Sequence, residues 1–285
     1  MPRPRRVAGN GARQGDGRRG GVRCAVQPEA GPGPDAGREE LREERAIVAS
    51  LLSPFGFFAG GGAAAPPLPS VAGLYARYSP DGPFWQDSAR TTVASADGDP
   101  IGAWDDGSGS GFHLLQAVAA GRPALKLGIV NGKRVARFAN HHLAAAFASR
   151  TQPVTVFMVA STAGSTTEDR KFFDAAAGPQ MAHQESGGQW WVYAGGFLSG
   201  GVANDNINQH TIVFNGAGGS LRVNRAAVLA GNTGANGQQG FILGRNQGFL
   251  EPLVGDVAEI LLYNAALSTT DRDAIESYLA TKYGL

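Results

Sequence analysis

The 285-residue chain has a single cysteine, Cys24, so it cannot form an intrachain disulfide and its fold must rest on a packed core. It also lacks an excess of charge of either sign, because its formal net charge is +1. A nearly neutral chain does not favour nucleic acid or an anionic membrane as the partner of the whole protein. Any function therefore has to come from local clusters of side chains.

The common catalytic motifs are missing as well. None of the five histidines, His113, His141, His142, His183 and His210, falls in a spacing typical of zinc sites. There is no G-x-S-x-G sequence for a serine nucleophile, and no histidine lies near the lone cysteine. These absences favour a protein that is not an enzyme.

The N-terminal 37 residues are rich in Arg, Gly and Pro and nearly devoid of large apolar side chains. Such a segment cannot bury enough apolar surface to offset its ordering entropy, so we expect residues 1–37 to be a disordered basic tail. The arginines would also suit an arm that binds nucleic acid, but we favour a tail without a specific partner.

An apolar, uncharged run follows at residues 46–65. It has about the length of a membrane span, but Pro54 and several glycines make it a poor one. We interpret residues 38–58 as a short helix and an anchor, followed by an Ala/Gly/Pro linker at 59–70. The anchor would dock on a partner protein through Leu51, Leu52, Phe55, Phe57 and Phe58. A signal sequence in 46–65 is the alternative.

From residue 71 the sequence pattern changes to short apolar runs separated by Gly, Asn and Pro. The runs richest in β-branched and aromatic residues are 154–160, 189–194, 210–215, 220–224, 240–244 and 256–263. Asn224-Arg225 fits a hairpin turn. Many short strands without alternating helices predict an all-β, antiparallel jelly-roll β-sandwich over residues 71–285.

One helix closes the chain. Ser268 is a good N-cap with Asp271 three residues on, and Gly284 is placed for a C-cap. The apolar stripe that we expect to pack on the sandwich consists of Ala274, Ile275, Tyr278 and Leu279, with the stem of Lys282.

Three stretches carry a resemblance to a known family: WQDSARTTVASADGDPIGAWDDGSGSGFHLLQ (85–116), GRPALKLGIVNGKRVARFANHHLAA (121–145) and GDVAEILLYNAALSTTDRDAIESYLATKYGL (255–285). They resemble the concanavalin A-like, LamG-type jelly-roll domains of tailed-phage virion proteins and bacterial surface proteins. The chain departs from that family at residues 139–142, where Ala-Asn-His-His replaces an acidic turn.

The resemblance implies a non-catalytic structural and adhesion protein of a phage or phage-like particle, which displays a carbohydrate-binding jelly roll to the host cell surface. A secreted or cell-surface bacterial lectin-like domain is the alternative, and a glycan-cleaving enzyme on the same fold is less favoured. Each of these places the protein on a virion or an extracellular surface, and the partner of residues 46–65 would then be a structural protein of the virion or cell surface. A homo-oligomer is left open.

Aromatic residues cluster in the run at 189–194, where strand alternation places Trp191 and Tyr193 on one face and Trp190 on the other. One of the two faces must be core. Aromatic faces bind sugar C–H patches, while amides and carboxylates bind hydroxyl groups. Trp191 and Tyr193, with Asn204, Asp205 and Asn206 of the polar run NDNIN, are therefore candidate carbohydrate-binding residues.

Oxygen atoms of the same polar run are candidate ligands for Ca²⁺, from Asp205, Asn206 and Asn208. No other cofactor is indicated. The plainer alternative is that the aromatics are core residues and that the asparagines only form a turn.

Asp256 and Glu259 lie on one predicted strand and invite comparison with the paired carboxyls of glycoside hydrolases. Residues three apart on a strand face opposite ways unless a bulge intervenes, and jelly-roll glucanases use an E-x-D-x-x-E spacing that is absent here. We expect both acids to be structural, and we expect no pair of acids near Trp191.

Overall fold

The computed structural model describes residues 66–163, 169–178 and 182–285. The predicted tail at 1–37, the predicted helix and anchor at 38–58, and the linker up to residue 65 lie outside the described residues. Within the described ranges, no helix is long and apolar enough to cross a membrane.

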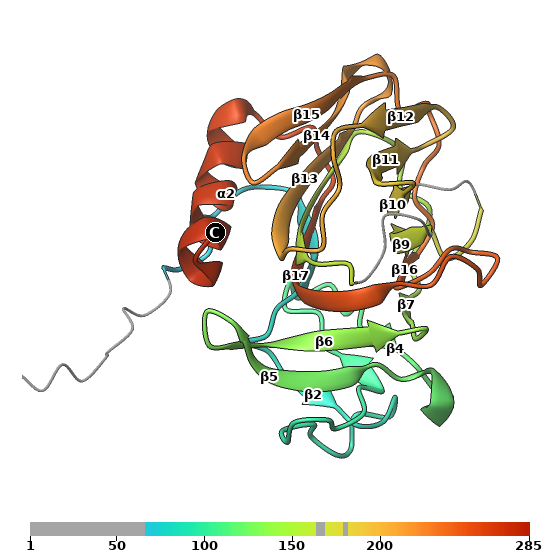
Figure 1. Cartoon of the computed structure of the whole chain (residues 1–285), viewed down its shortest axis with the longest axis vertical. Coiled ribbons are helices and arrows are strands. Elements are labelled where there is room, and N and C mark those ends of the chain that lie inside the picture. The colour runs from blue at the N-terminus through green and yellow to red at the C-terminus, as the bar shows by residue number, and fades with distance from the viewer. Residues whose placement is uncertain (1–65, 164–168, 179–181) are drawn as a thin grey trace, which may run out of the picture. The chain divides into compact units, whose positions relative to one another are not determined.

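Two antiparallel sheets form a sandwich (Figure 1). The eight-stranded sheet has the order β15-β14-β13-β8-β17-β6-β5, and β1 also pairs with β17. Its strands are β1 (Leu74–Tyr78), β5 (Ala124–Val130), β6 (Lys133–Ala139), β8 (Val154–Ala160), β13 (Asn208–Phe214), β14 (Gly219–Val223), β15 (Ala226–Gly231) and β17 (Val254–Tyr263).

The nine-stranded sheet has the order β12-β11-β10-β9-β16-β7-β4-β3-β2. Its strands are β2 (Phe84–Trp85), β3 (Ala103–Trp104), β4 (Leu114–Leu115), β7 (Leu143–Ala145), β9 (Arg170–Asp174), β10 (Ala182–Ser186), β11 (Gln189–Tyr193), β12 (Phe197–Gly200) and β16 (Phe241–Leu243). Short 3₁₀ turns lie at Ala119–Gly121 and Gly216–Gly218.

The main core lies between the inner faces of the sheets, which both contribute large side chains such as Trp104, Trp190, Phe172 and Phe214. Each strand expected from an apolar run is present, with ends that differ by up to two residues. Asn224 and Arg225 both have positive φ, at 47° and 70°, as a type I′ hairpin turn requires. The all-β sandwich predicted from the sequence is therefore confirmed.

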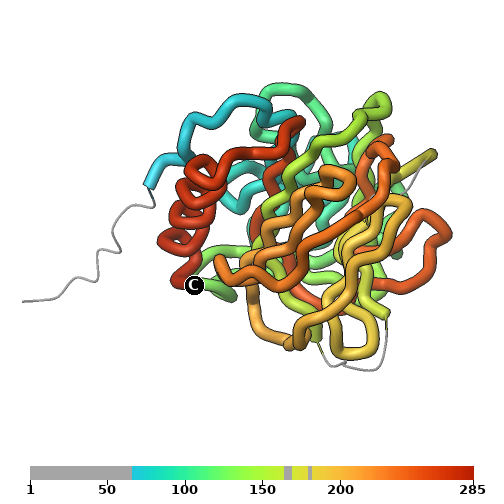
Figure 2. Tube along the Cα trace, turned by 90° about the horizontal axis from the view of Figure 1, so that it is seen from above, coloured from blue at the N-terminus to red at the C-terminus, as the bar shows by residue number. Residues whose placement is uncertain are grey.

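The C-terminal helix α2 (Thr269–Tyr283) covers the outer face of the eight-stranded sheet (Figures 1 and 2). Ser268 Oγ accepts from Asp271 N at 3.1 Å, and Gly284 closes the helix with a φ of 70°. Ile275, Tyr278 and Leu279 pack on Phe157, Val159, Leu261 and Tyr263 of the sheet. The cap and docking predictions are therefore correct.

The predicted apolar stripe needs two corrections. Ala274 is exposed, and Lys282 buries its ammonium as well as its stem. In addition, Leu68 packs on the same cluster as the helix, so the last part of the predicted linker already belongs to the domain.

A buried ionic cluster explains Lys282. Its Nζ lies 2.7 Å from Glu259 Oε2 and 3.0 Å from Ser79 Oγ, and both ionic side chains are fully buried. Tyr283 OH donates to the same carboxylate at 2.7 Å, and Arg77 Nη2 lies 3.2 Å from its other oxygen. The cluster joins β1, β17 and α2, so Glu259 is structural, as expected, although its partners are mainly on the helix.

Asp256 is structural as well. Arg137 of the neighbouring strand β6 donates to both of its carboxylate oxygens at 2.7 Å. A register shift between Val257 and Glu259 interrupts strand alternation and brings both acids to the outer face of the sheet. The bulge makes them face the same way, yet each carboxylate is already held by its own cation.

We expect Glu259→Gln to lower the free energy of unfolding by about 3–5 kcal/mol, because it leaves the buried Lys282 ammonium without its main counter-charge. Chemical denaturation monitored by tryptophan fluorescence measures this change. Adding Lys282→Met should recover part of the loss. Asp97→Asn, which breaks the exposed pair with Lys126, is the control and should cost less than about 1 kcal/mol. Equal effects of the two acid variants would contradict the structural role of the cluster.

Candidate functional site

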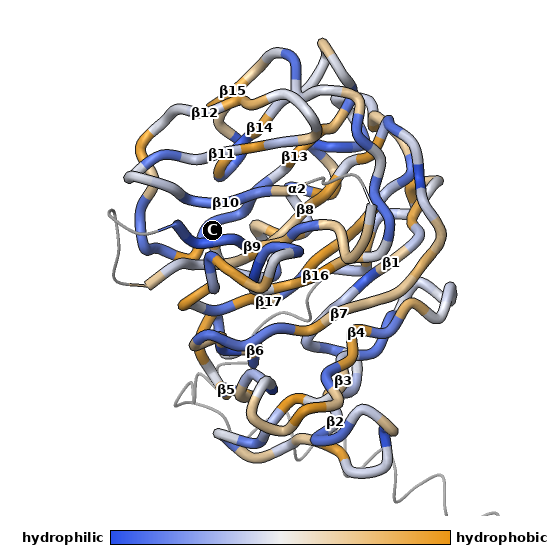
Figure 3. Tube along the Cα trace, turned by 90° about the vertical axis from the view of Figure 1, so that its right-hand side faces the viewer, coloured by the Kyte–Doolittle hydropathy of each residue, from blue (hydrophilic) through white to orange (hydrophobic). Residues whose placement is uncertain are grey.

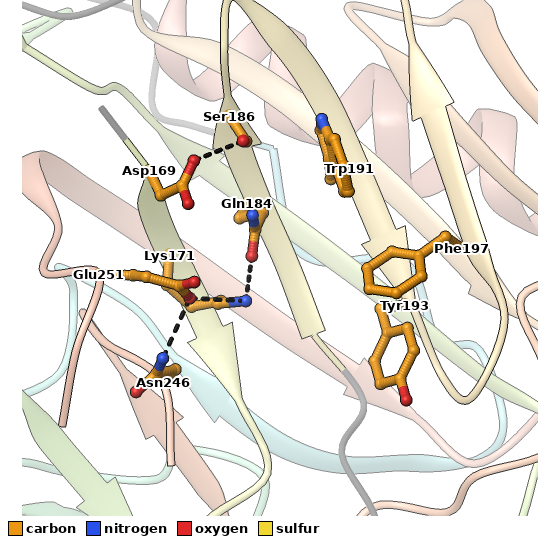
Figure 4. A pocket seen from close by; sticks show the side chains of 9 residues that line it. All are labelled: Asp169, Lys171, Gln184, Ser186, Trp191, Tyr193, Phe197, Asn246 and Glu251. Carbon is orange, nitrogen blue, oxygen red and sulfur yellow. Dashed lines mark hydrogen bonds and ion pairs between the residues drawn. The ribbon is translucent and has the colours of Figure 1, made fainter. Parts of the chain in front are cut away.

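A pocket lies on the outer face of the nine-stranded sheet, across β9 to β12 (Figure 4). It has a volume of about 280 Å³. Its lining side chains come from four adjacent strands and the β16–β17 loop, and they are Asp169, Lys171, Gln184, Ser186, Trp191, Tyr193, Phe197, Asn246 and Glu251.

Strand alternation creates the pocket. On β11, Trp190 is buried in the core, whereas Trp191 and Tyr193 point outward into the pocket. On the neighbouring strand β10, His183 points into the core and Gln184 faces the pocket. Figure 3 shows that β10 is largely hydrophilic although it lies inside the sheet. An interior strand with polar residues on its outer face therefore marks a surface that interacts with water or a ligand.

One wall of the pocket is aromatic. The Tyr193 and Phe197 rings lie 4.4 Å apart between centroids, and Trp191 meets Phe197 edge-on at 5.4 Å. Phe197 is 64% exposed, on the edge strand β12. Among the described residues, the indole N–H of Trp191 has no protein acceptor. This nitrogen is itself buried, so the wall offers apolar ring surface to a ligand.

The opposite wall is polar and is held together by its own contacts. Lys171 Nζ lies 3.0 Å from Glu251 Oε2 and also contacts the Gln184 side-chain oxygen. Asn246 Nδ2 donates to the same Glu251 oxygen at 3.1 Å. Figure 4 shows these contacts facing the aromatic side chains across the pocket.

A second polar contact joins Ser186 of β10 to Asp169, which precedes β9. Among the described residues, each carboxylate of the pocket therefore has one oxygen in contact with the protein wall, and its other oxygen remains as an acceptor.

The β16–β17 loop carries Asn246 and Glu251 into the pocket. Asn246 Oδ1 accepts from Leu250 N at 2.8 Å, and Lys171 N donates to the Glu251 carbonyl at 3.1 Å. Phe249 and Glu251 both have positive φ, at 62° and 54°, which is rare for side chains of this size. Backbone strain of this kind is concentrated at binding and catalytic sites, so the loop fits a role in recognition.

A pair of histidines lies under the pocket, in the core. His183 Nδ1 donates to the Trp191 carbonyl at 3.0 Å, which leaves His183 Nε2 to accept from His210 Nδ1 at 3.1 Å. Both rings pack on Phe172. Burial lowers the pKa of His183 to about 4 and that of His210 well below its ordinary value, so both rings are neutral at pH 7.

Trp191 and Tyr193 were predicted from the sequence and both line the pocket, whereas Asn204, Asp205 and Asn206 do not. The polar run connects β12 of one sheet to β13 of the other, so it passes around the edge of the sandwich and does not cross the sheet face. The pocket therefore contains Trp191 and Tyr193 of the predicted residues, and a role of Asn204, Asp205 and Asn206 in carbohydrate binding stays a prediction.

The polar run is closed by its own hydrogen bonds. Asn204 Oδ1 accepts from Asn206 N at 3.0 Å and from Asn208 Nδ2 at 2.9 Å, and Thr162 Oγ1 donates to Asp205 at 3.2 Å. These contacts are those of a turn. No cluster of three or more His, Cys, Asp or Glu that could hold a metal occurs in the described ranges, and the Ca²⁺ ligands Asp205, Asn206 and Asn208 stay a prediction.

Asp169 and Glu251 line the same pocket as Trp191. The expectation that no pair of acids lies near Trp191 is therefore wrong. These two acids are far apart in the sequence, and the loop that brings Glu251 to the sheet has no recognisable sequence pattern. The sequence also gave no sign that Lys171, Phe197 or Asn246 would join them.

Comparison with known proteins does not assign the chain to a family. No model of a known protein family matches it, and neither does any curated protein. Among solved structures, Trypanosoma rangeli sialidase aligns with a TM-score of 0.46 and 19% identity over 86% of this chain, which spans 38% of the sialidase.

Two other solved structures are domains. Domain 4 of AbnA, an extracellular arabinanase from Geobacillus stearothermophilus in complex with arabinotriose, aligns with a TM-score of 0.39 and 16% identity, over 72% of this chain and 97% of that domain. The receptor binding domain of botulinum neurotoxin D aligns with a TM-score of 0.48 and 10% identity, over 73% and 52%. Identities and TM-scores at this level say nothing about what this chain binds.

The histidine pair predicts an acid-sensitive core. The unfolded chain binds protons at both histidines near pH 6.5, whereas the folded chain does not until the pH falls much lower. The free energy of unfolding should therefore fall as the pH drops below 6.5, by about 1.4 kcal/mol per pH unit for each histidine. His210→Leu should lower this slope by the contribution of one proton, about 1.4 kcal/mol per pH unit, between about pH 6.5 and 5.

Denaturant unfolding at a series of pH values measures the slope. The comparison is between the parent chain and the variant. His142, whose pKa is also lowered to about 4, contributes equally to the slope of both proteins. An unchanged slope in His210→Leu would show that His210 does not titrate as its burial implies.

Proposed function

We propose that this domain is a carbohydrate-binding module that holds its ligand in the pocket between the aromatic and polar walls. The observation that carries the proposal is the opposition of Trp191, Tyr193 and Phe197 to a set of carboxylates and amides in one hollow. The proposal follows from the chemistry of these side chains.

A sugar ring has apolar C–H faces and a rim of hydroxyl groups that both donate and accept. Aromatic rings suit the faces. The free oxygens of Asp169 and Glu251 accept from hydroxyls, whereas the Gln184 and Asn246 amides donate to them. The volume of about 280 Å³ is at the lower end of the roughly 300–1,000 Å³ of small-molecule pockets, which suits one or two sugar units.

We expect Trp191→Ala to weaken glycan binding by roughly ten- to a hundredfold, about 1.4–2.8 kcal/mol, because it removes ring surface that would be buried by the sugar. Trp191→Phe should keep part of the affinity, since it retains an aromatic face of smaller area. Titration of the full chain against glycans first identified on an array measures both.

Val202→Ala is the matched control, because Val202 is 84% exposed and does not line the pocket. A Trp191→Ala protein that melts normally and binds as tightly as the parent would remove the pocket from consideration. The same titration in EDTA tests the predicted Ca²⁺ at Asp205, Asn206 and Asn208.

We further propose that the pocket binds glycans without cleaving them. Two carboxylates near an aromatic wall are the specific observation that favours a hydrolase as the second candidate. A cleaving pair needs both carboxyl groups at the scissile bond, however, whereas Glu251 is already engaged by Lys171 Nζ at 3.0 Å and by Asn246 Nδ2 at 3.1 Å. Incubation of each bound glycan with the protein, followed by product analysis, separates the two candidates, because any shortened product would establish cleavage.

The setting in which the module works is also part of the proposal. The stretch at 85–116 resembles the corresponding part of phage and prophage virion proteins, and this supports display on a phage or phage-like particle. We expect purified particles from the source to contain the protein with residues 46–65 intact, as measured by mass spectrometry. A secreted protein that begins near Pro66 would instead support the lectin-like alternative.

A further inference from the structure

We infer that the pocket selects neutral glycans over acidic ones, and that Glu251 sets this selectivity by occupying the Lys171 ammonium. The inference rests on the proposed function and adds the class of ligand and the residue that determines it.

The charges that line the pocket do not favour an anion. Asp169 and Glu251 are acidic and Lys171 is basic, and no Arg or His lines the pocket, so the formal charge is +1 − 2 = −1. A carboxylated or sulfated sugar would bring a further negative charge close to the two carboxylates. At such short range in a partly buried site, like charges repel strongly.

Lys171, the one cation among the described residues that line the pocket, is already engaged. Lys171 Nζ pairs with Glu251 Oε2 at 3.0 Å and contacts the Gln184 side-chain oxygen, and the Lys171 side chain is only 11% exposed. A ligand anion would have to compete for this ammonium with a carboxylate that the protein holds at contact distance. The ammonium therefore helps to position the polar wall and is not free to recognise an acidic group.

The loop fixes Glu251 in this position. Its backbone carbonyl accepts from Lys171 N at 3.1 Å, and its carboxylate accepts from Asn246 Nδ2 at 3.1 Å. Gln247 N donates to the buried Asp174 at 3.1 Å and ties the loop to the sheet beneath it. Glu251 itself has a φ of 54°, a conformation that persists only where the surroundings impose it.

The first experiment compares matched ligands on the full chain. Titrations use lactose against 3′-sialyllactose, and xylotriose against xylotriose that carries a glucuronate branch. We expect the neutral member of any bound pair to bind at least tenfold more tightly. Neutral binding should change less than about twofold between roughly 0.05 and 0.5 M NaCl, because no ligand charge is there to be screened.

The second experiment separates the role of Glu251 from net charge. Glu251→Gln and Asp169→Asn each remove one negative charge, but only Glu251→Gln releases the Lys171 ammonium. We expect Glu251→Gln to raise the affinity for the acidic member at least fivefold, and Asp169→Asn to raise it less than twofold. A gain of binding also shows that the variant is folded.

Three results would overturn the inference, and they differ from a failure of the proposed function. Equal or tighter binding of the acidic member by the parent chain would reject the selectivity while leaving the carbohydrate site intact. Equal gains in Glu251→Gln and Asp169→Asn would assign the selectivity to net charge and not to Glu251. Binding of a neutral glycan that is unaffected by Trp191→Ala would place the site elsewhere and end both proposals.

Discussion

The pairing of β10 with β11 is the interaction on which both the core and the pocket depend. Gln184 lies opposite Trp191, and Glu185 lies opposite Trp190, in one continuous antiparallel register. Because side chains alternate, the same few residues fill the core on one side and form a binding surface on the other. A slip of one residue would move Trp191 inward and Trp190 outward, which would destroy both at once. The His183 bond to the Trp191 carbonyl adds a side-chain contact that fixes this register from inside the core.

The polar wall depends on a different kind of constraint. Strands alone cannot bring Asn246 and Glu251 over the sheet, so a loop must fold back onto β9 and hold them there. Two non-glycine residues with positive φ, Phe249 and Glu251, cost of order 1–3 kcal/mol each. The hydrogen bonds of Asn246 and the ion pair with Lys171 offset that cost. A loop that served only to connect β16 to β17 would have no need of such strain.

The sequence predicts those parts of the molecule that depend on local periodicity. Alternation along 189–194 separated Trp190 from Trp191 and Tyr193, and the capping residues Ser268 and Gly284 marked the ends of the helix. The pocket as a whole could not be predicted, because Asp169, Lys171 and Glu251 are brought together by strand order and by one loop, which leave no periodic signal. Nor could the sequence show that Asn204, Asp205 and Asn206 lie outside this pocket. Their composition suits sugar binding, but the chain crosses there from one sheet to the other.

The two pairs of acids show why spacing along the chain is a poor guide to chemistry in this fold. Asp256 and Glu259 are close in the sequence and share a face, yet Arg137 and Lys282 neutralise them within the framework of the sheet and helix. Asp169 and Glu251 are far apart in the sequence, and their contacts leave carboxylate oxygens available in an open hollow beside an aromatic wall. What distinguishes the pairs is how completely cations and donors enclose each carboxylate. The enclosed pair stabilises the sandwich, and the accessible pair is the one able to meet a ligand.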